Sequence, residues 1–135
     1  MRFLIDNDLS PHIAAAINPL VEPHGHQVTA LRRKFAENAE DVVWIEALGR
    51  EGGWVVISGD SNITRRAAER NAWRQARLVG FFLAPGWRKL DPLQQTARLL
   101  MWWDRIVAQA GLVEGGAIFQ LSINPGSRLR QLPYW

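Results

Sequence analysis

The chain has 135 residues, of which 47% are hydrophobic, and it contains no cysteine. We expect one compact domain over residues 1–135, while the missing cysteines exclude a disulfide scaffold, a cysteine-ligated zinc site and a thiol nucleophile. No apolar run approaches the ~20 residues that a membrane span requires, so we expect a cytoplasmic protein with neither signal peptide nor membrane anchor.

The net charge of +3 divides into two opposite halves. Residues 1–60 hold five basic and nine acidic side chains, whereas residues 61–135 hold eleven basic and four acidic ones. Fourteen of the sixteen basic residues are arginines, which can bind a phosphate through two parallel hydrogen bonds. This division favours a metal-dependent site acting on a phosphate polymer, although an ordinary charged surface would give the same composition.

Short apolar runs alternate with segments of helical periodicity along the chain. Ser10 and Pro11 are typical of a helix start, since the hydroxyl caps the helix and proline suits its first turn. We expect strands over residues 3–5, 26–31, 54–57, 78–83 and 117–123. We expect helices from residue 11, from residue 39, over 63–75 and over 91–110, with a loop over 32–38 and an irregular tail after residue 125. The alternation predicts a three-layer α/β/α sandwich with a mostly parallel central sheet.

Acidic residues follow two of the predicted buried strands. Asp6 comes directly after residues 3–5, and Asp60 follows residues 54–57 within three positions. Ligands of parallel sheets bind beyond the carboxyl ends of the strands, which lie ~4.8 Å apart, so these carboxylates could meet on one cation. An all-oxygen site suits Mg²⁺ or Mn²⁺.

Three further acids are candidates for the same cluster. Glu40 and Asp41 begin a predicted helix, where acidic side chains also favour the helix dipole without any functional role. Asp8 suits a metal ligand, a hydrogen-bonding support or a helix cap equally well.

Four segments, in order, resemble the PIN-like domains related to VapC-type toxins. The opening MRFLIDNDLSP resembles their first strand, acidic turn and helix start, and GHQV at 25–28 resembles their second strand. EDVVW at 40–44 resembles their acidic helix start, and WVVISGDSN at 54–62 resembles the acidic end of their third strand. The resemblance covers about residues 1–85 and implies a PIN-like fold.

The resemblance implies specific roles at these positions. It assigns metal-binding acids to Asp6, Asp41 and Asp60, and a catalytic hydroxyl beside the metal to Ser58. Asn62 stands where relatives commonly have a second aspartate, so the site loses one negative charge there and leaves reduced or absent catalysis open. Three residues remain additional candidate ligands: Asp8, Glu40 and Asn62.

The function implied by the resemblance is a Mg²⁺- or Mn²⁺-dependent endoribonuclease, the toxin of a VapBC-like toxin–antitoxin pair. Its cation would activate a water for hydrolysis of RNA phosphodiesters. Its partners would be RNA, a small cognate antitoxin protein and a second copy of the chain.

Arginines provide a candidate surface for RNA or for an acidic antitoxin segment. Arg66, Arg70 and Arg74 are four residues apart and should lie along one face of the predicted 63–75 helix, with Arg65 beside them. A solvated face with an Arg65–Glu69 ion pair is the alternative. Three residues form a second candidate patch: Arg32, Arg33 and Lys34.

Seven tryptophans are many for this length. We expect Trp44 and Trp54 in the core, and of the adjacent Trp102 and Trp103 we expect one to face the sheet and the other a partner or cleft. Three others could stack on bases but more commonly such residues pack in a core or interface: Trp73, Trp87 and Trp135.

Two other functions remain open. Residues 6–10, DNDLS, also resemble the nucleophile motif of haloacid-dehalogenase-like phosphohydrolases, but no later lysine precedes an Asp-Asp pair. A PIN-like binding module without catalysis is the second alternative, and Asn62 favours it.

Overall fold

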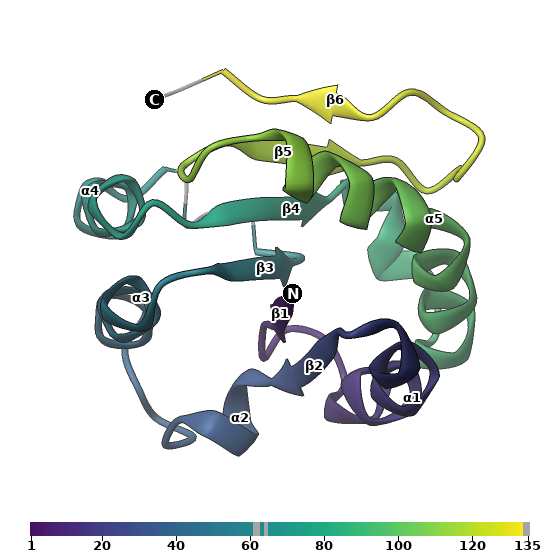
Figure 1. Cartoon of the computed structure of the whole chain (residues 1–135), viewed down its shortest axis with the longest axis horizontal. Helices are drawn as coiled ribbons and strands as arrows, with labels where there is room; N and C mark the ends of the chain where they lie inside the picture. The colour runs from purple at the N-terminus through teal and green to yellow at the C-terminus, as the bar shows by residue number, and fades with distance from the viewer. Residues whose placement is uncertain (61–62, 64, 134–135) are drawn as a thin grey trace.

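The computed structural model describes residues 1–60, 63 and 65–133, and its central feature is a six-stranded sheet between layers of helices (Figure 1). The strand order is β2-β1-β3-β4-β5-β6, and every neighbouring pair is parallel except β5 with β6. The predicted three-layer α/β/α sandwich with a mostly parallel sheet is confirmed. The strands are β1 (Arg2–Ile5), β2 (Gln27–Ala30), β3 (Trp54–Ser58), β4 (Val79–Leu83), β5 (Ile118–Leu121) and β6 (Arg130–Gln131).

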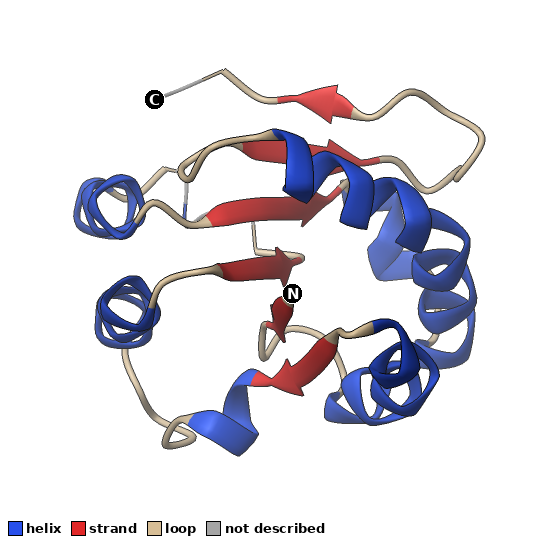
Figure 2. Cartoon of the chain, in the orientation of Figure 1, coloured by secondary structure: helices blue, strands red, loops and turns tan. Residues whose placement is uncertain are grey.

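Helices cover both faces of this sheet (Figure 2). One face packs against α1 (Pro11–Val21) and α5 (Pro92–Leu112), and the other against α3 (Asp41–Glu51) and α4 (Ala67–Ala76). None of the described helices is long and apolar enough to cross a membrane. Short helical segments complete the described chain: α2 (Leu31–Lys34) and the 3₁₀ helices η1 (Glu22–His24) and η3 (Pro85–Lys89).

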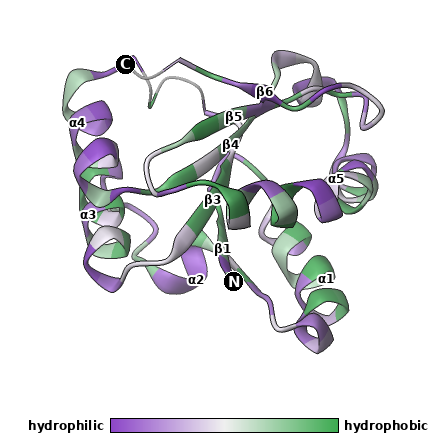
Figure 3. Cartoon of the chain, turned by 45° about the horizontal axis from the view of Figure 1, so that its top comes forward, coloured by the Kyte–Doolittle hydropathy of each residue, from purple (hydrophilic) through white to green (hydrophobic). Residues whose placement is uncertain are grey.

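Alternating side chains of the strands build two separate cores. In β1, Phe3 and Ile5 point to the α1 and α5 side, whereas Leu4 points to the α3 and α4 side. The central strands consist mainly of hydrophobic residues, whereas the helices carry both hydrophilic and hydrophobic ones (Figure 3). A sheet buried on both faces requires such near-continuous apolar strands.

A local capping signal predicts the start of α1 correctly. Ser10 accepts a hydrogen bond from the backbone N–H of His12 at 3.2 Å, with Pro11 at the first helical position.

The boundaries of two other elements differ from those predicted. The predicted strand over 26–31 is shorter than expected, and residues 31–34 form the helical turn α2 where we expected the end of the strand and a loop. The helix expected from residue 63 begins only at Ala67.

The C-terminal tail is more regular than its sequence predicts. Arg130 and Gln131 form β6, an antiparallel edge strand opposite Gln120 and Phe119. The prediction of a wholly irregular tail after residue 125 is therefore wrong. The tail finds backbone partners on β5, which a local pattern does not reveal.

The described tryptophans are buried. Trp44 and Trp54 lie in the core as expected, and Trp102 and Trp103 are both buried too. Trp103 also lines a cavity of about 210 Å³ with His24 and His26, in keeping with the expectation that one of this pair faces a cleft. Trp103 packs against the ring of Phe3 at 4.7 Å between ring centroids. Trp73 and Trp87 are buried as well, which agrees with core packing, the more common of the two roles considered for them, while Trp135 lies outside the described residues.

Candidate active site at the carboxyl edge of the sheet

The acidic residues gather where the carboxyl ends of β1 and β3 lie side by side. Ile5 pairs with Ile57, and the chain leaves both strands at this edge. β1 continues to β2 on one side, and β3 continues to β4 on the other, so the strand order reverses here. Such a reversal opens a crevice beyond the strand ends, and ligands of open parallel sheets bind there.

Asp6 follows β1 directly at this edge and is only 6% exposed. Its backbone N–H donates to Ile57 O at 3.0 Å, which continues the β1–β3 pairing. One carboxylate oxygen accepts from Ser58 Oγ at 2.8 Å, and the other accepts from the backbone N–H of Asn7 at 2.6 Å. Burial raises the pKa of Asp6 above its usual range, and these hydrogen bonds only partly offset that effect.

Ser58 connects the two strand ends. Its side chain is fully buried, and while it donates to Asp6 it also accepts a hydrogen bond from the backbone N–H of Asp60 at 3.0 Å. One hydroxyl therefore sets the orientation of the Asp6 carboxylate and the path of the chain towards Asp60.

Asp8 lies in the turn after β1, with its carboxylate against Gly59. A Cβ atom at position 59 would collide with Asp8 Oδ2, so any residue other than glycine would push the carboxylate out of its present position. Although the residue as a whole is exposed, burial of the carboxylate raises its pKa to about 7, and repulsion from Asp6 and Asp60 adds to the shift.

An arginine connects two more of the predicted acids, Asp41 and Asp60. Arg66 Nη2 lies 3.2 Å from Asp41 Oδ2 and 3.3 Å from Asp60 Oδ2. Its Nε lies 3.4 Å from Glu69 Oε1, and Trp44 Nε1 donates to the other oxygen of Asp41 at 3.0 Å. Since α3 packs on α4, Asp41 at the start of one helix meets Arg66 at the start of the other.

Two predicted ligands fall outside this arrangement. Glu40 is an exposed residue at the start of α3, and within the described chain its side chain makes no capping hydrogen bond. Asn62 lies outside the described residues.

The carboxylate oxygens at this edge are suitable ligands for a hard divalent cation, but their present spacing does not suit one. Buried or crowded carboxylates with raised pKa values gain from a nearby positive charge, and their oxygens are the ligands that Mg²⁺ and Mn²⁺ prefer. Among the described residues, however, no three His, Cys, Asp or Glu side chains are placed to hold a metal ion. The guanidinium of Arg66 is instead the positive charge between Asp41 and Asp60.

The basic residues are distributed differently from the predicted stripe. Arg66 precedes α4 and turns to the acids, whereas Arg70 and Arg74 lie on the helix and Arg65 before it. The considered Arg65–Glu69 ion pair is replaced by Arg66 with Glu69.

The second predicted patch is also divided. Arg32 Nη2 donates to Asn7 O at 3.5 Å, which brings it to the acidic edge. Arg33 is exposed and lines a shallow cavity between α1 and β2 instead.

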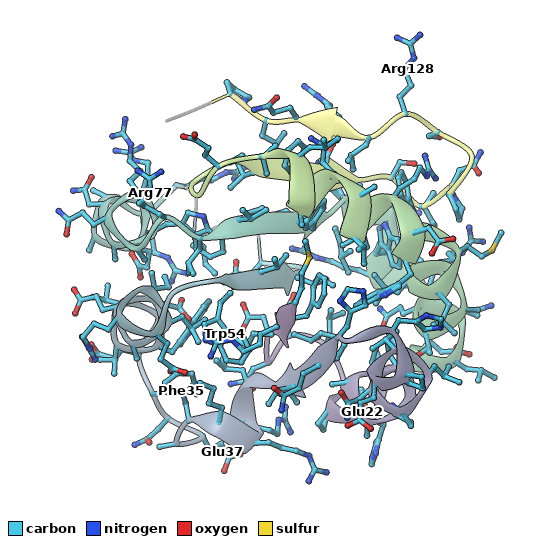
Figure 4. The ribbon with its side chains drawn as sticks, viewed as in Figure 1. Glu22, Phe35, Glu37, Trp54, Arg77 and Arg128 are labelled. Carbon is cyan, nitrogen blue, oxygen red and sulfur yellow. The ribbon has the colours of Figure 1, made fainter. Side chains whose placement is uncertain are left out.

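A pocket beside the acids is lined by Arg88, which was not among the candidate residues named from the sequence. Asp8 and Gly59 form one side of a cavity of about 180 Å³, and Arg88 of η3 lies on its rim. The sequence could have indicated Arg88, because η3 follows the carboxyl end of β4. Since β4 is the neighbour of β3, this end lies at the same edge of the sheet as the acids. A cavity of about 480 Å³ lies at the opposite edge, near Trp54 and Arg77 (both labelled in Figure 4), and none of the described residues that line it carries a carboxylate.

Comparison with known proteins identifies the family. A family model described as a PIN-like domain matches residues 1–85, which is more than half of the chain, and the chain therefore belongs to the PIN-like domain family. No curated protein and no solved structure matches it. The matched residues run from β1 to just beyond β4 and include every acid of the carboxyl edge.

Proposed function

We propose that this PIN-like protein is an endoribonuclease that hydrolyses RNA phosphodiesters with Mg²⁺ or Mn²⁺. The observation that supports this most is the gathering of Asp6, Asp8 and Asp60 at the reversal of strand order, where burial raises the pKa values of Asp6 and Asp8 and the charge of Asp60 adds to both shifts. Carboxylates are kept in such an unfavourable arrangement when a positively charged ligand relieves it.

Asp6, Asp41 and Asp60 would hold the cation, and Ser58 would keep Asp6 in the orientation to do so. A bound cation of this kind supplies an activated water and stabilises the negative charge that develops on the phosphate. Arg66 would have to release Asp41 and Asp60 for the cation to bind. The freed guanidinium would then be available for a phosphate of the RNA.

Basic residues at the same edge support an RNA substrate. Arg32 lies against the turn after β1, and Arg66 lies at the start of α4 against Asp41 and Asp60. Arginines on both sides of an acidic centre would hold the backbone phosphates while the carboxylates stay near the bond to be cleaved.

A binding module without catalysis is the second candidate. The observation that favours it is the contact of Arg66 with both Asp41 and Asp60, which satisfies two of the predicted ligands inside the protein. In that case RNA or protein binding would be unaffected by EDTA and no cleavage would occur.

An RNA cleavage assay separates the two candidates. We expect cleavage of single-stranded RNA in Mn²⁺ or Mg²⁺, its loss in EDTA, and its loss by a factor of about 100 or more in Asp6→Asn. Asp104→Asn, at an exposed position on α5, is the matched control and should keep full activity. Full activity of Asp6→Asn would exclude the proposed centre, and a phosphorylated Asp6 would indicate a phosphohydrolase instead.

We further infer a VapC-type toxin with a small antitoxin partner. The support is the sequence resemblance over residues 1–85 together with the family match. Expression in bacteria should arrest growth, and Asp6→Asn should relieve the arrest at equal protein level. Arrest that persists in Asp6→Asn would argue against a toxin that acts through this site.

A further inference from the structure

We propose that the cavity beside the acidic edge is a subsite for one unpaired nucleobase of the RNA, with Arg88 binding the phosphate next to that base. This inference rests on the proposed ribonuclease function. We call the cavity the Arg88 pocket; its walls include Asp8, Gly59, Leu83, Ala84, Trp87 and Arg88.

The position of the pocket joins it to the candidate active site. Asp8 belongs both to the acidic edge, where its carboxylate lies near Asp6 and Asp60, and to the pocket wall. Gly59 packs against that carboxylate, and the pocket continues past Gly59 to the end of β4. A nucleotide with its phosphate at the acids could therefore place a neighbouring base in the pocket.

The shape and chemistry of the walls favour a base. Leu83 and Ala84 provide apolar surface, while Asp8 and Arg88 provide polar groups at the margin. A nucleobase has the same division, with apolar ring faces and hydrogen-bonding edges. The volume of about 180 Å³ is well below the ~300 Å³ at which drug-sized pockets begin, so it suits a single ring system.

The floor of the pocket is fixed before any ligand binds. Trp87 is 1% exposed, and its Nε1 donates to Leu121 O at 3.0 Å. The buried side chain of Gln95 donates to Trp87 O at 3.1 Å and so attaches η3 to α5. A preformed wall loses little conformational entropy on binding.

Arg88 is the group that points to an anionic ligand. It is exposed on η3, and within the described part of the chain it makes no ion pair and no side-chain hydrogen bond. Other arginines of this edge, such as Arg32 and Arg66, contact protein acceptors. An uncommitted guanidinium on the rim of a base-sized pocket is suited to a backbone phosphate.

Nucleoside 5′-monophosphates are a suitable probe because they contain no phosphodiester to cleave. We would titrate each of the four into the ¹⁵N-labelled protein and follow the backbone amides of Gly59, Ala84 and Arg88 by NMR. Saturable shifts of these amides are expected with the nucleotides. Ribose 5-phosphate, which lacks the base, should bind roughly tenfold more weakly or worse.

Two variants test the two halves of the pocket. Ala84→Leu fills the cavity and should abolish nucleotide binding while circular dichroism shows an intact fold. Arg88→Ala should weaken binding by roughly tenfold, and Lys89→Ala, the matched control on the same turn, should change it less than about twofold. Both pocket variants should also slow RNA cleavage or change its base preference.

Several outcomes would overturn the inference. Equal binding of ribose 5-phosphate and the nucleotides would leave only a phosphate site, and shifts confined to the cavity near Trp54 would place the ligand elsewhere. Nucleotide binding lost in Ala84→Leu without any change in RNA cleavage would assign the pocket to a free nucleotide. Failure of the proposed ribonuclease function is distinguishable, because it would appear as absent RNA cleavage while nucleotides still bind.

Discussion

The hydroxyl of Ser58 donates a hydrogen bond to Asp6 Oδ2 over 2.8 Å, although the two residues are 52 positions apart in the chain. Both are buried at the ends of neighbouring parallel strands. This hydrogen bond replaces one that water would make to the carboxylate if it were exposed. It also fixes the orientation of the carboxylate. The stability of the edge and the charge of Asp6 therefore depend on the same contact.

Ser58→Ala should reduce the free energy of unfolding by about 2 kcal/mol, because a buried carboxylate loses a hydrogen bond. The pKa of Asp6, already above its usual range, should rise further. Urea denaturation and NMR titration of the Asp6 carboxyl measure the two effects. Ser10→Ala is the control: it removes the cap of α1 and costs about 1 kcal/mol without moving the pKa of Asp6. An unchanged Asp6 pKa in Ser58→Ala would show that the hydroxyl does not position this carboxylate.

Stability should fall as the pH rises through the range in which Asp8 ionises. The pKa of Asp8 is about 7 in the folded protein against 3.8 as its ordinary value, so the folded state binds this proton more tightly than the unfolded one. The contribution of the Asp8 proton to the free energy of unfolding is complete below about pH 4. It disappears by about pH 7, where Asp8 ionises in the folded protein.

The check is denaturation of the wild type and Asp8→Asn at several pH values in EDTA. Asp8→Asn should flatten the decline between pH 4 and 7 by about 1 kcal/mol, a modest figure because the residue is exposed, so that water reduces both the cost of burying its charge and the repulsion from Asp6 and Asp60. Parallel pH profiles for the two proteins would contradict the raised pKa of Asp8.

Arg66→Gln should tighten Mn²⁺ binding. The guanidinium and a divalent cation compete for Asp41 and Asp60, and half-exposed ion pairs are worth up to about 1 kcal/mol each, so roughly three- to tenfold tighter binding is expected. Calorimetric titration with Mn²⁺ measures this without any need for catalysis. Arg65→Gln is the matched control and should leave the affinity within about twofold. Weaker Mn²⁺ binding in Arg66→Gln would mean that the arginine organises the acids instead of competing for them.

Gly49→Ala should destabilise the protein by disturbing the contact between α3 and α4. A Cβ at position 49 would lie 2.6 Å from Ala76 Cβ and 2.8 Å from Ala76 Cα, so the helices would have to separate. We expect the free energy of unfolding to fall by about 1–2 kcal/mol, since overpacking between the helices outweighs the better helix propensity of alanine.

Gly111→Ala provides the control, because among the described residues the new Cβ meets only Met1 Cε, at 3.4 Å. The free energy of unfolding should change by less than about 1 kcal/mol. Thermal and urea unfolding compare the two variants. Equal stability of Gly49→Ala and Gly111→Ala would show that the helix contact is not tight.

The sequence by itself determined the layer architecture and the edge at which the acids lie. Buried parallel strands must be apolar on both faces, so their ends are visible as the points where Asp6 and Asp60 follow Ile5 and Ser58–Gly59. Because parallel strands end at the same edge, these acids had to lie near each other. The start of α1 was predictable for a similarly local reason, since Ser10 and Pro11 act on the backbone beside them.

Only the tertiary structure decided which groups the acids contact. Whether Arg66 binds Asp41 or points along α4 depends on how α3 packs against α4, and the pairing of Asp8 with Gly59 depends on two loops meeting in space. The same holds for Trp102 and Trp103, which both find buried surroundings because the chain encloses α5 on more than one side. Local periodicity records the preference of a residue for a helix or a strand, whereas ion pairs and pockets arise between residues that are distant in the chain.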